Sequence, residues 1–219
     1  MRLSEKNKER LTFFADTLTP GPYRCFLCDK ETEIGEDGLC DACRHAIRYL
    51  PNPTFLPPLD GATVGLRYSP EIAAAILRYK NGGFTEYAPF FTQFLSVPAE
   101  WQADILIPVP THPLKEWMRG FHHSALLCAH LSRSVGIPYS TKLLHKVRFT
   151  GEQKQQENAA ERRRNIRNSF RADPLVKGLR IVLVDDVFTT GATVYECAKT
   201  LKQKGADKVF LAAVSAPDR

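Results

Sequence analysis

The hydrophobic positions follow two different periods along the chain, and these periods alternate. Short apolar runs bounded by polar residues, glycine or proline are typical of strands. They occupy residues 62–68, 103–110, 141–147, 181–184 and 208–215. Apolar residues three or four positions apart predict helices between them, over 71–80, 86–95, 122–135 and 194–204. Strands that alternate with helices predict an α/β fold whose parallel sheet is flanked by helices.

Two segments interrupt this alternation and indicate where domains meet. Residues 1–19 place apolar side chains on one face of a short amphipathic helix, which Pro20 ends. Residues 49–61 are rich in proline and are typical of a linker. We therefore predict an N-terminal domain over 1–48, a linker over 49–61 and a larger domain over 62–219.

The composition changes this picture only slightly. A chain of 219 residues with 43% hydrophobic residues can build one large domain, or a medium domain with a small appendage. The net charge of +6 fits nucleic acid or phosphorylated ligands, and it fits a soluble basic surface equally well.

The N-terminal residues lack the continuous apolar run of a secretory signal, and no run in the sequence has the length needed to cross a bilayer. We therefore expect a cytoplasmic protein without membrane insertion, whose thiols stay reduced. Six cysteines in that setting indicate metal binding or core packing rather than disulfides. Cys128 and Cys197 stand on apolar helix faces and are predicted to be small core residues.

The other four cysteines form two C-x-x-C pairs, Cys25 with Cys28 and Cys40 with Cys43. Each pair can present two thiolates from one tight turn, and two pairs complete a tetrahedral four-sulfur site. A segment this short buries too little apolar surface to fold alone, so a metal would supply its stability. We predict structural zinc, with no open position for catalysis. The alternatives are reduced thiols in a mobile arm and a redox pair, and the redox pair is disfavoured because no strand precedes it.

Two adjacent acids, Asp185 and Asp186, follow the apolar run 181–184 directly. A continuous apolar run is typical of a central parallel strand, and ligands of open α/β sheets bind beyond the carboxyl ends of the strands. Two carboxylates at that end can accept hydrogen bonds from vicinal hydroxyl groups or hold a hydrated Mg²⁺.

The residues after the acids form a turn into a helix, "VFTTGAT". Backbone N–H groups at a helix N-terminus suit a phosphate, the threonine hydroxyls add donors, and Gly191 allows a close backbone approach. Acids beside a phosphate-binding turn predict a sugar phosphate ligand. The segment is not a nucleotide P-loop, because it lacks G-x-x-x-x-G-K-[ST]. Nor does its position, after several strand–helix units, fit the acidic pocket of a response regulator.

The run "VLVDDVFTTGAT" resembles the phosphoribosyl pyrophosphate signature of type I phosphoribosyltransferases. The resemblance implies that Asp185 and Asp186 contact the ribose hydroxyls, with Mg²⁺ bound alongside the ligand. It also implies that the turn cradles the 5-phosphate through Thr189, Thr190, Gly191, Ala192 and Thr193.

The chain as a whole resembles the ComF family of competence proteins. The order of a four-cysteine segment, "PVPTHPLKEWMRGF", a basic stretch and the signature carries this resemblance. It implies that a loop binds pyrophosphate through Val109, Pro110 and Thr111. Lys115 and Arg119 would supply cations there, and Arg119 would act in catalysis together with the two acids.

Two adjacent positions after this segment depart from the family pattern. The family usually has Asn-Gln after R-G-F, whereas this chain has His122 and His123. The departure leaves the role of these two positions open.

The stretch from Lys142 to Arg171 carries nine Lys or Arg against three Glu. Part of it resembles the family's T-x-x-Q…R-x-x-N segment. Three interpretations compete: a catalytic loop that closes over pyrophosphate, a nucleic-acid surface, and a solvated helix face. The candidates for contacts with single-stranded DNA are Lys146, Arg148, Arg162, Arg163, Arg164 and Arg167.

Two functions remain after these observations. The first is a binding protein for phosphoribosyl pyrophosphate with Mg²⁺ and single-stranded DNA, acting in DNA uptake or handling, with a competence helicase as the partner that the resemblance implies. The second is an active transferase that moves the phosphoribosyl group to an acceptor and releases pyrophosphate. The sequence names no acceptor.

Overall fold

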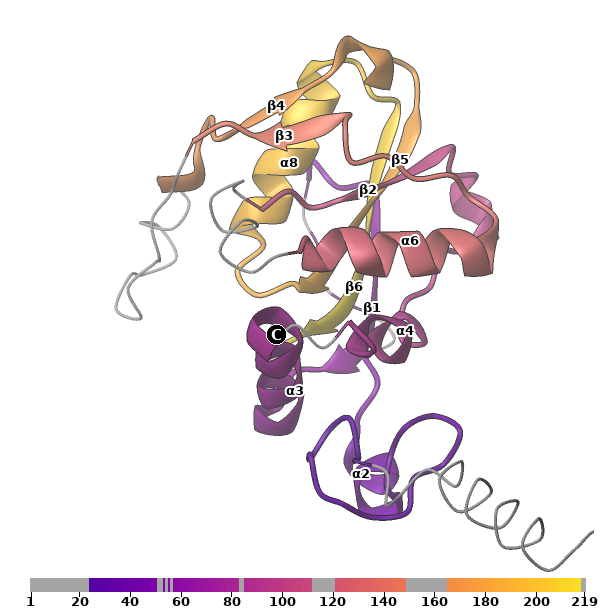
Figure 1. Ribbon diagram of the computed structural model, residues 1–219. Coiled ribbons are helices and arrows are strands. Elements are labelled where there is room, and N and C mark those ends of the chain that lie inside the picture. The colour runs from indigo at the N-terminus through magenta and orange to yellow at the C-terminus, as the bar shows by residue number, and fades with distance from the viewer. Residues whose placement is uncertain are drawn as a thin grey trace, which may run out of the picture. The chain divides into compact units, whose positions relative to one another are not determined.

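The computed structural model describes two compact units, formed by residues 1–46 and 47–219 (Figure 1). The described residues are 24–50, 53, 55, 57–82, 85–111, 121–148 and 165–217. The helix predicted over 1–19 lies outside them.

The larger unit contains a four-stranded sheet in which every pairing is parallel. The strand order is β1-β6-β5-β2. The strands are β1 (Gly61–Arg67), β2 (Ile105–Pro108), β5 (Arg180–Val187) and β6 (Lys208–Ala216). This sheet confirms the predicted parallel α/β fold, and it brings the carboxyl ends of all four strands to one edge.

Helices cover both faces of this sheet (Figure 1). Helix α6 packs against β2 and β5, and α4 packs against α6, whereas α8 packs against β6. The helices are α3 (Pro70–Gly82), α4 (Tyr87–Thr92), α6 (His123–Val135) and α8 (Ala192–Gln203), with short 3₁₀ turns at Ala99–Trp101 and Pro174–Val176. In the part of the chain that the structure describes, no helix combines the length and the apolar character needed to span a membrane.

The strand period of two divides the buried residues between the two faces. Ile181 and Leu183 of β5 belong to the same buried cluster as Cys197, Ala198 and Leu201 of α8. Because successive side chains of a strand point to opposite faces, Val182 and Val184 face the other side of the sheet, where α6 lies. Cys128 and Cys197 are both fully buried, which confirms that they are core residues.

A second, two-stranded sheet was only half predicted. Strand β3 (Leu144–Lys146) lies within the predicted strand 141–147 and pairs antiparallel with β4 (Phe170–Ala172). Neither a loop nor a solvated helix face describes the end of the basic stretch, because Phe170 and Arg171 pair with β3 as a strand. Phe170 and Ala172 are buried while Arg171 is exposed, which is a strand pattern too short to stand out in a polar sequence.

The proline-rich segment makes backbone contacts with the first strand. The N–H of Leu50 donates to the carbonyl of Gly65, and the N–H of Arg67 donates to the carbonyl of Arg48. Leu59 is buried in the core of the larger unit, and Gly61 already belongs to β1.

Candidate functional site

Strand β5 continues through both aspartates. Asp185 pairs with Ala213 of β6, and Val187 pairs with Ser215, so the strand geometry extends past the acids. Because side chains alternate along a strand, the two carboxylates leave β5 on opposite faces of the sheet. The ends of the two side chains nevertheless come together, because an oxygen of each carboxylate and a ring nitrogen of His123 all lie within 4.8 Å of one another.

Asp186 is buried among charged partners from two helices. Its side chain is 4% exposed, and Nζ of Lys80 in α3 lies 2.9 Å from Oδ1 and 2.8 Å from Oδ2. Nε2 of His123, the first residue of α6, lies 3.4 Å from Oδ2. Burial alone would raise the pKa of the Asp186 carboxyl, but the charges of Lys80 and His123 outweigh it and hold that pKa below its usual range.

Asp185 is half-buried and lies beside the turn that joins β5 to α8. Its Oδ1 accepts hydrogen bonds from the backbone N–H of Asp186 at 3.0 Å and from Oγ of Ser124 at 3.3 Å. Burial, and then the negative charge of Asp186, raise the pKa of the Asp185 carboxyl well above its ordinary value. Asp186 is therefore firmly ionised. The charge of Asp185, in contrast, is costly unless a cation or a hydroxyl donor lies beside it.

The turn after β5 forms a small polar hollow with Asp185. Gly191 immediately precedes α8 and has a φ of 73°, in the left-handed region that favours glycine. Helix α8 begins at Ala192, so the N–H groups of its first turn point toward the hollow. The lining comprises Asp185 and all the residues from Val187 to Val194. The structure therefore brings Asp185, Thr189, Thr190, Gly191, Ala192 and Thr193 together, as the sequence predicted.

The loop after β2 lies at the same edge of the sheet. Val109 and Pro110 are buried and Thr111 is half-buried. The N–H of Val109 donates to the carbonyl of Val184 at 2.9 Å. This N–H is therefore part of the hydrogen bonding between β2 and β5 and is not available to a ligand. Pro110 and Thr111 line a second polar hollow together with His122 and Lys146.

His122 caps the N-terminus of α6. Its Nδ1 accepts a hydrogen bond from the N–H of Ala125 at 3.2 Å. Burial lowers the pKa of this imidazole to about 4, so the neutral ring that the cap requires is the form present at neutral pH. His122 thus performs at this position the work that an asparagine performs at other helix starts.

The cations predicted by sequence fall into two groups. Lys115, Arg119, Arg162, Arg163 and Arg164 lie outside the described residues. Lys146 is half-buried, with Nζ 5.7 Å from the centre of the Phe170 ring, while Arg148 and Arg167 are exposed. A hydrogen bond from Nη1 of Arg148 to the carbonyl of Arg167, at 3.5 Å, links the last two.

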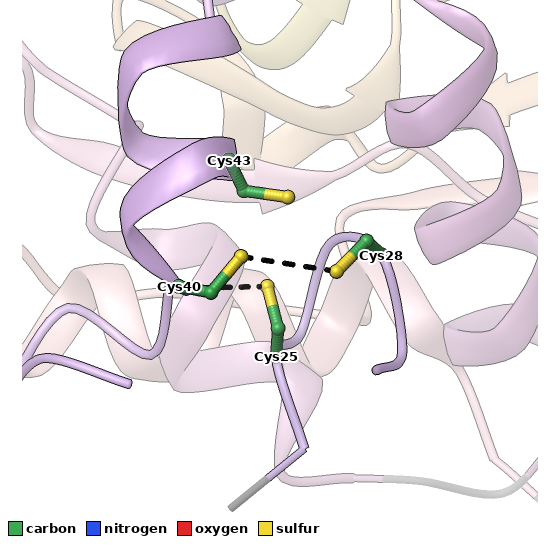
Figure 2. A group of neighbouring side chains, drawn as sticks. All are labelled: Cys25, Cys28, Cys40 and Cys43. Atoms are coloured by element: carbon green, nitrogen blue, oxygen red, sulfur yellow. Dashed lines mark hydrogen bonds between the residues drawn. The ribbon is translucent and has the colours of Figure 1, made fainter. Parts of the chain in front are cut away.

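The four N-terminal cysteines converge on one point (Figure 2). Their Sγ atoms all lie within 4.8 Å of one another, and those of Cys28 and Cys40 are 3.9 Å apart. A tetrahedral zinc with Zn–S bonds of about 2.3 Å would space its sulfurs roughly 3.8 Å apart. The cluster therefore fits a metal ion of this kind, and these four residues can hold it.

Local backbone structure creates this convergence. Cys25 and Cys28 flank a tight turn, and Cys43 lies on α2 (Asp41–Ala46), one turn beyond Cys40. The N–H of Cys40 donates to Sγ of Cys25 at 3.4 Å. Burial would raise the pKa of the Cys25 thiol, but backbone donors including this one outweigh it and lower the pKa to about 7. Burial, and after it the neighbouring thiols, raise the pKa values of Cys28 and Cys43, so four thiolates at this point would need a cation among them.

Three side chains at the site were not predicted from the sequence: Lys80, His123 and Ser124. The spacing of Lys80 and His123 along their helices could have indicated that they are buried. Lys80 follows the buried Ile76 by four positions, and His123 precedes the buried Leu127 by four. A charged or titratable residue on the apolar face of a helix indicates a buried partner, which only the fold could identify as Asp186.

The larger unit and the chain as a whole have recognisable relatives. A sequence model of the family described as phosphoribosyl transferase domain matches residues 122–218. DNA utilization protein YhgH of Escherichia coli O157:H7 is 31% identical over 215 residues, which cover 86% of this chain and 94% of that protein. Competence protein F of Haemophilus influenzae is 26% identical over 216 residues, which cover 85% of this chain and 94% of that protein.

The chain belongs to the ComF family of competence proteins. The larger unit of this ComF chain has a type I phosphoribosyltransferase-like fold. Among solved structures, the glutamine phosphoribosylpyrophosphate amidotransferase from B. subtilis, complexed with ADP and GMP, is 20% identical with a TM-score of 0.39, and the match covers 62% of this chain and 30% of that chain.

Proposed function

We propose that this ComF protein binds phosphoribosyl pyrophosphate with Mg²⁺ in its larger unit, and that it binds single-stranded DNA as part of DNA uptake or handling. The observation that carries the ligand assignment is the hollow at the end of β5. It joins the Asp185 carboxylate to a threonine-rich turn at the N-terminus of α8. An acid beside helix N–H groups suits a ligand with hydroxyls at one end and a phosphate at the other.

Mg²⁺ would arrive with the ligand. Asp185 and Asp186 could hold the ion, which would offset negative charge on the pyrophosphate. Lys115 and Arg119 would neutralise the remaining pyrophosphate charge from the loop after β2.

The four cysteines would hold a structural zinc, because all four positions of a tetrahedral ion are filled by sulfur. This site would order the smaller unit and would take no part in chemistry. Its contribution to the proposed function is to hold the chain around α2 in a defined conformation.

The DNA assignment has a separate basis. Relatives of this chain bear the names DNA utilization protein and competence protein. The stretch 142–171 concentrates positive charge, which suits a phosphate backbone. Phe170 is buried in the core, so it is not available for stacking on bases.

Calorimetric titration with phosphoribosyl pyrophosphate and Mg²⁺ tests the ligand assignment. We expect one binding site per chain, and loss of binding in the double variant Asp185→Asn, Asp186→Asn. That variant should still bind a fluorescent oligo-dT, because the basic stretch is not changed. Absence of heat with the wild-type protein at millimolar ligand would refute the assignment. Release of pyrophosphate in the presence of candidate acceptors would show that binding proceeds to transfer.

Salt dependence tests the DNA surface. Replacement of Arg162, Arg163 and Arg164 by Gln should weaken oligo-dT binding and reduce the slope of log affinity against log salt by about 2, because each lost phosphate contact removes roughly 0.7. The matched control replaces the exposed residues Arg133, Lys177 and Lys204, which removes the same charge outside this stretch. Equal slopes for the wild type and the first variant would exclude these arginines from the DNA surface.

A further inference from the structure

The β3–β4 hairpin has an inner and an outer face. Phe170 and Ala172 of β4 are buried in the same cluster as residues of α8, so they mark the inner face, and β4 lies beside α8 (Figure 1). Lys146 lies directly opposite Phe170, and residues opposite each other in an antiparallel pair share a face. Arg171 stands between the two buried residues and is exposed, as is His145 opposite it. Because successive side chains alternate, the hairpin separates Arg171 from Lys146.

Lys146 is held on the inner face. Its Nζ lies 5.7 Å from the centre of the Phe170 ring, and the residue is half-buried. Lys146 also lines the polar hollow that contains Thr111 and His122. Among the described residues, those that line this hollow include His145 but not Arg171. A partner that lies on the outer face therefore meets Arg171 and does not meet the ammonium group of Lys146.

Two further arginines stand where the connection between the strands begins and ends. Arg148 follows β3 by two residues, and Arg167 precedes β4 by three. A hydrogen bond from Nη1 of Arg148 to the carbonyl of Arg167, at 3.5 Å, brings them together. Both are exposed, as is Arg171. The hairpin thus presents three guanidinium groups to solvent.

No acid of the hairpin neutralises these groups. Residues 141–148 and 165–172 contain five Lys or Arg and no Asp or Glu. In the part of the chain that the structure describes, no salt bridge involves Arg148, Arg167 or Arg171. Arg171 lies opposite His145, although an acid there would have stabilised the pair of strands. Exposed guanidinium groups without carboxylate partners suit the phosphates of a polyanion.

Helix α8 fixes the backbone that presents these cations. Asn168 has a φ of 56°, in the left-handed region, and its N–H donates to Oε1 of Glu196 in α8 at 2.8 Å. The side chain of Glu196 is only 13% exposed. The turn that carries Arg167 into β4 is therefore anchored to the larger unit. An anchored backbone lowers the entropy that a bound strand of nucleic acid would cost.

We propose that single-stranded DNA lies across the outer face of the β3–β4 hairpin, where its phosphates contact Arg148, Arg167 and Arg171. This inference rests on the proposed binding of single-stranded DNA and states where the strand lies. Arg171 thereby becomes a DNA contact that the sequence had not singled out. Lys146, a candidate from the sequence, leaves the set of DNA contacts because it faces the hollow.

The salt dependence of oligo-dT binding separates the two faces. Arg167→Gln together with Arg171→Gln should reduce the slope of log affinity against log salt by about 1.4, because each lost phosphate contact removes roughly 0.7. Lys146→Gln removes a charge from the same hairpin but should leave the slope unchanged. Arg171→Lys keeps the charge and should keep the slope of the wild type.

Two controls exclude other causes. Arg133→Gln together with Lys177→Gln removes two exposed charges outside the hairpin and should not change the slope. Lys146→Met keeps an apolar stem against the Phe170 ring, so it repeats the test of the inner face with less loss of packing than Lys146→Gln. Melting temperatures of all variants show whether the larger unit stays folded at the temperature of the titration.

Three results would overturn the inference. The first is a wild-type slope in the variant that lacks Arg167 and Arg171. The second is a reduction of the slope in Lys146→Gln and Lys146→Met as large as that in Arg171→Gln, which would mean that the faces are not divided. The third is an equal reduction in the variant that lacks Arg133 and Lys177, which would reduce the effect to net charge. A wild type that does not bind oligo-dT would instead refute the DNA binding in the proposed function, and the inference with it.

Discussion

At the scale of single residues, His122 and His123 show how a departure from a family pattern acquires physical meaning. Each histidine stands where the family usually has an amide residue, and the sequence left both roles open. His122 accepts from the N–H of Ala125 and so caps α6, while His123 lies against the buried carboxylate of Asp186. The sequence could predict the helix and its start, but not a hydrogen bond to a ring nitrogen, because that depends on the rotamer and on burial.

The cap predicts a pH dependence of stability. Burial lowers the pKa of His122 to about 4, below its unfolded value of about 6.5, so the unfolded chain binds the proton more readily. The stabilisation is therefore complete above about pH 6.5 and is lost as the pH falls toward about 4. His122→Asn keeps a cap without titrating, and should flatten the pH dependence of the unfolding free energy across this window. His122→Ala should cost about 1 kcal/mol near pH 7.5.

Urea unfolding at several pH values between about 4 and 7.5 measures this effect. The control is His145→Asn, a change of the same type at an exposed position. A pH slope of His122→Asn equal to that of the wild type would contradict the role of His122 as a neutral cap.

At the scale of elements, the turn between β5 and α8 was predictable and the hairpin β3–β4 was not. The sequence predicts the turn because its acids, threonines and glycine stand next to one another in the chain, and each residue type has a local role there. The hairpin joins segments separated by some twenty residues, and each of its strands has only three residues. Burial of Phe170 against the larger core makes this pairing stable, and such tertiary contacts leave no periodic trace in a short polar sequence.

Gly191 provides a prediction for the turn. A Cβ at this position would lie 2.4 Å from a ring carbon of Tyr195 and 2.9 Å from one of Phe188, in addition to the strain of a positive φ. Gly191→Ala should therefore destabilise the larger unit by more than the roughly 1–2 kcal/mol that a left-handed alanine costs. It should also weaken the binding of ribose 5-phosphate, because a displaced Phe188 would change the lining of the hollow.

Gly136→Ala is the matched control for this change. Gly136 has nearly the same φ, 72°, and a Cβ there would meet no atom within 4 Å. It should cost only the backbone strain and leave sugar phosphate affinity unchanged. Equal losses of stability and of affinity in the two variants, measured by urea unfolding and calorimetry, would show that the rings beside Gly191 do not matter.

At the scale of the whole molecule, the two units obtain their stability from different sources. The larger unit has a continuous buried core on a four-stranded sheet, and the pattern of apolar positions predicted this arrangement. The smaller unit buries few apolar side chains, among them Leu27 and Leu39, and gathers its four cysteines at one point. Spacing alone predicted that gathering, because two C-x-x-C pairs at this separation are typical of a four-sulfur metal site. The choice of zinc as the ion rests only on the preference of zinc for four thiolate ligands.

Removal of the proposed zinc should therefore unfold the smaller unit and spare the larger one. Structural zinc supplies roughly 10–16 kcal/mol to small domains of this kind, so chelation, or Cys43→Ser, should raise hydrogen exchange at backbone amides between Cys25 and Cys43. Both tryptophans of the chain, Trp101 and Trp117, belong to the larger unit, and the Trp101 ring stacks on Phe210 with centroids 4.5 Å apart. The unfolding midpoint reported by tryptophan fluorescence should consequently stay the same with and without chelator, while one equivalent of zinc is released per chain. A midpoint that falls in step with zinc release would contradict this assignment, because it would place the released ion in the larger unit, where His123, Asp185 and Asp186 also form a possible metal group.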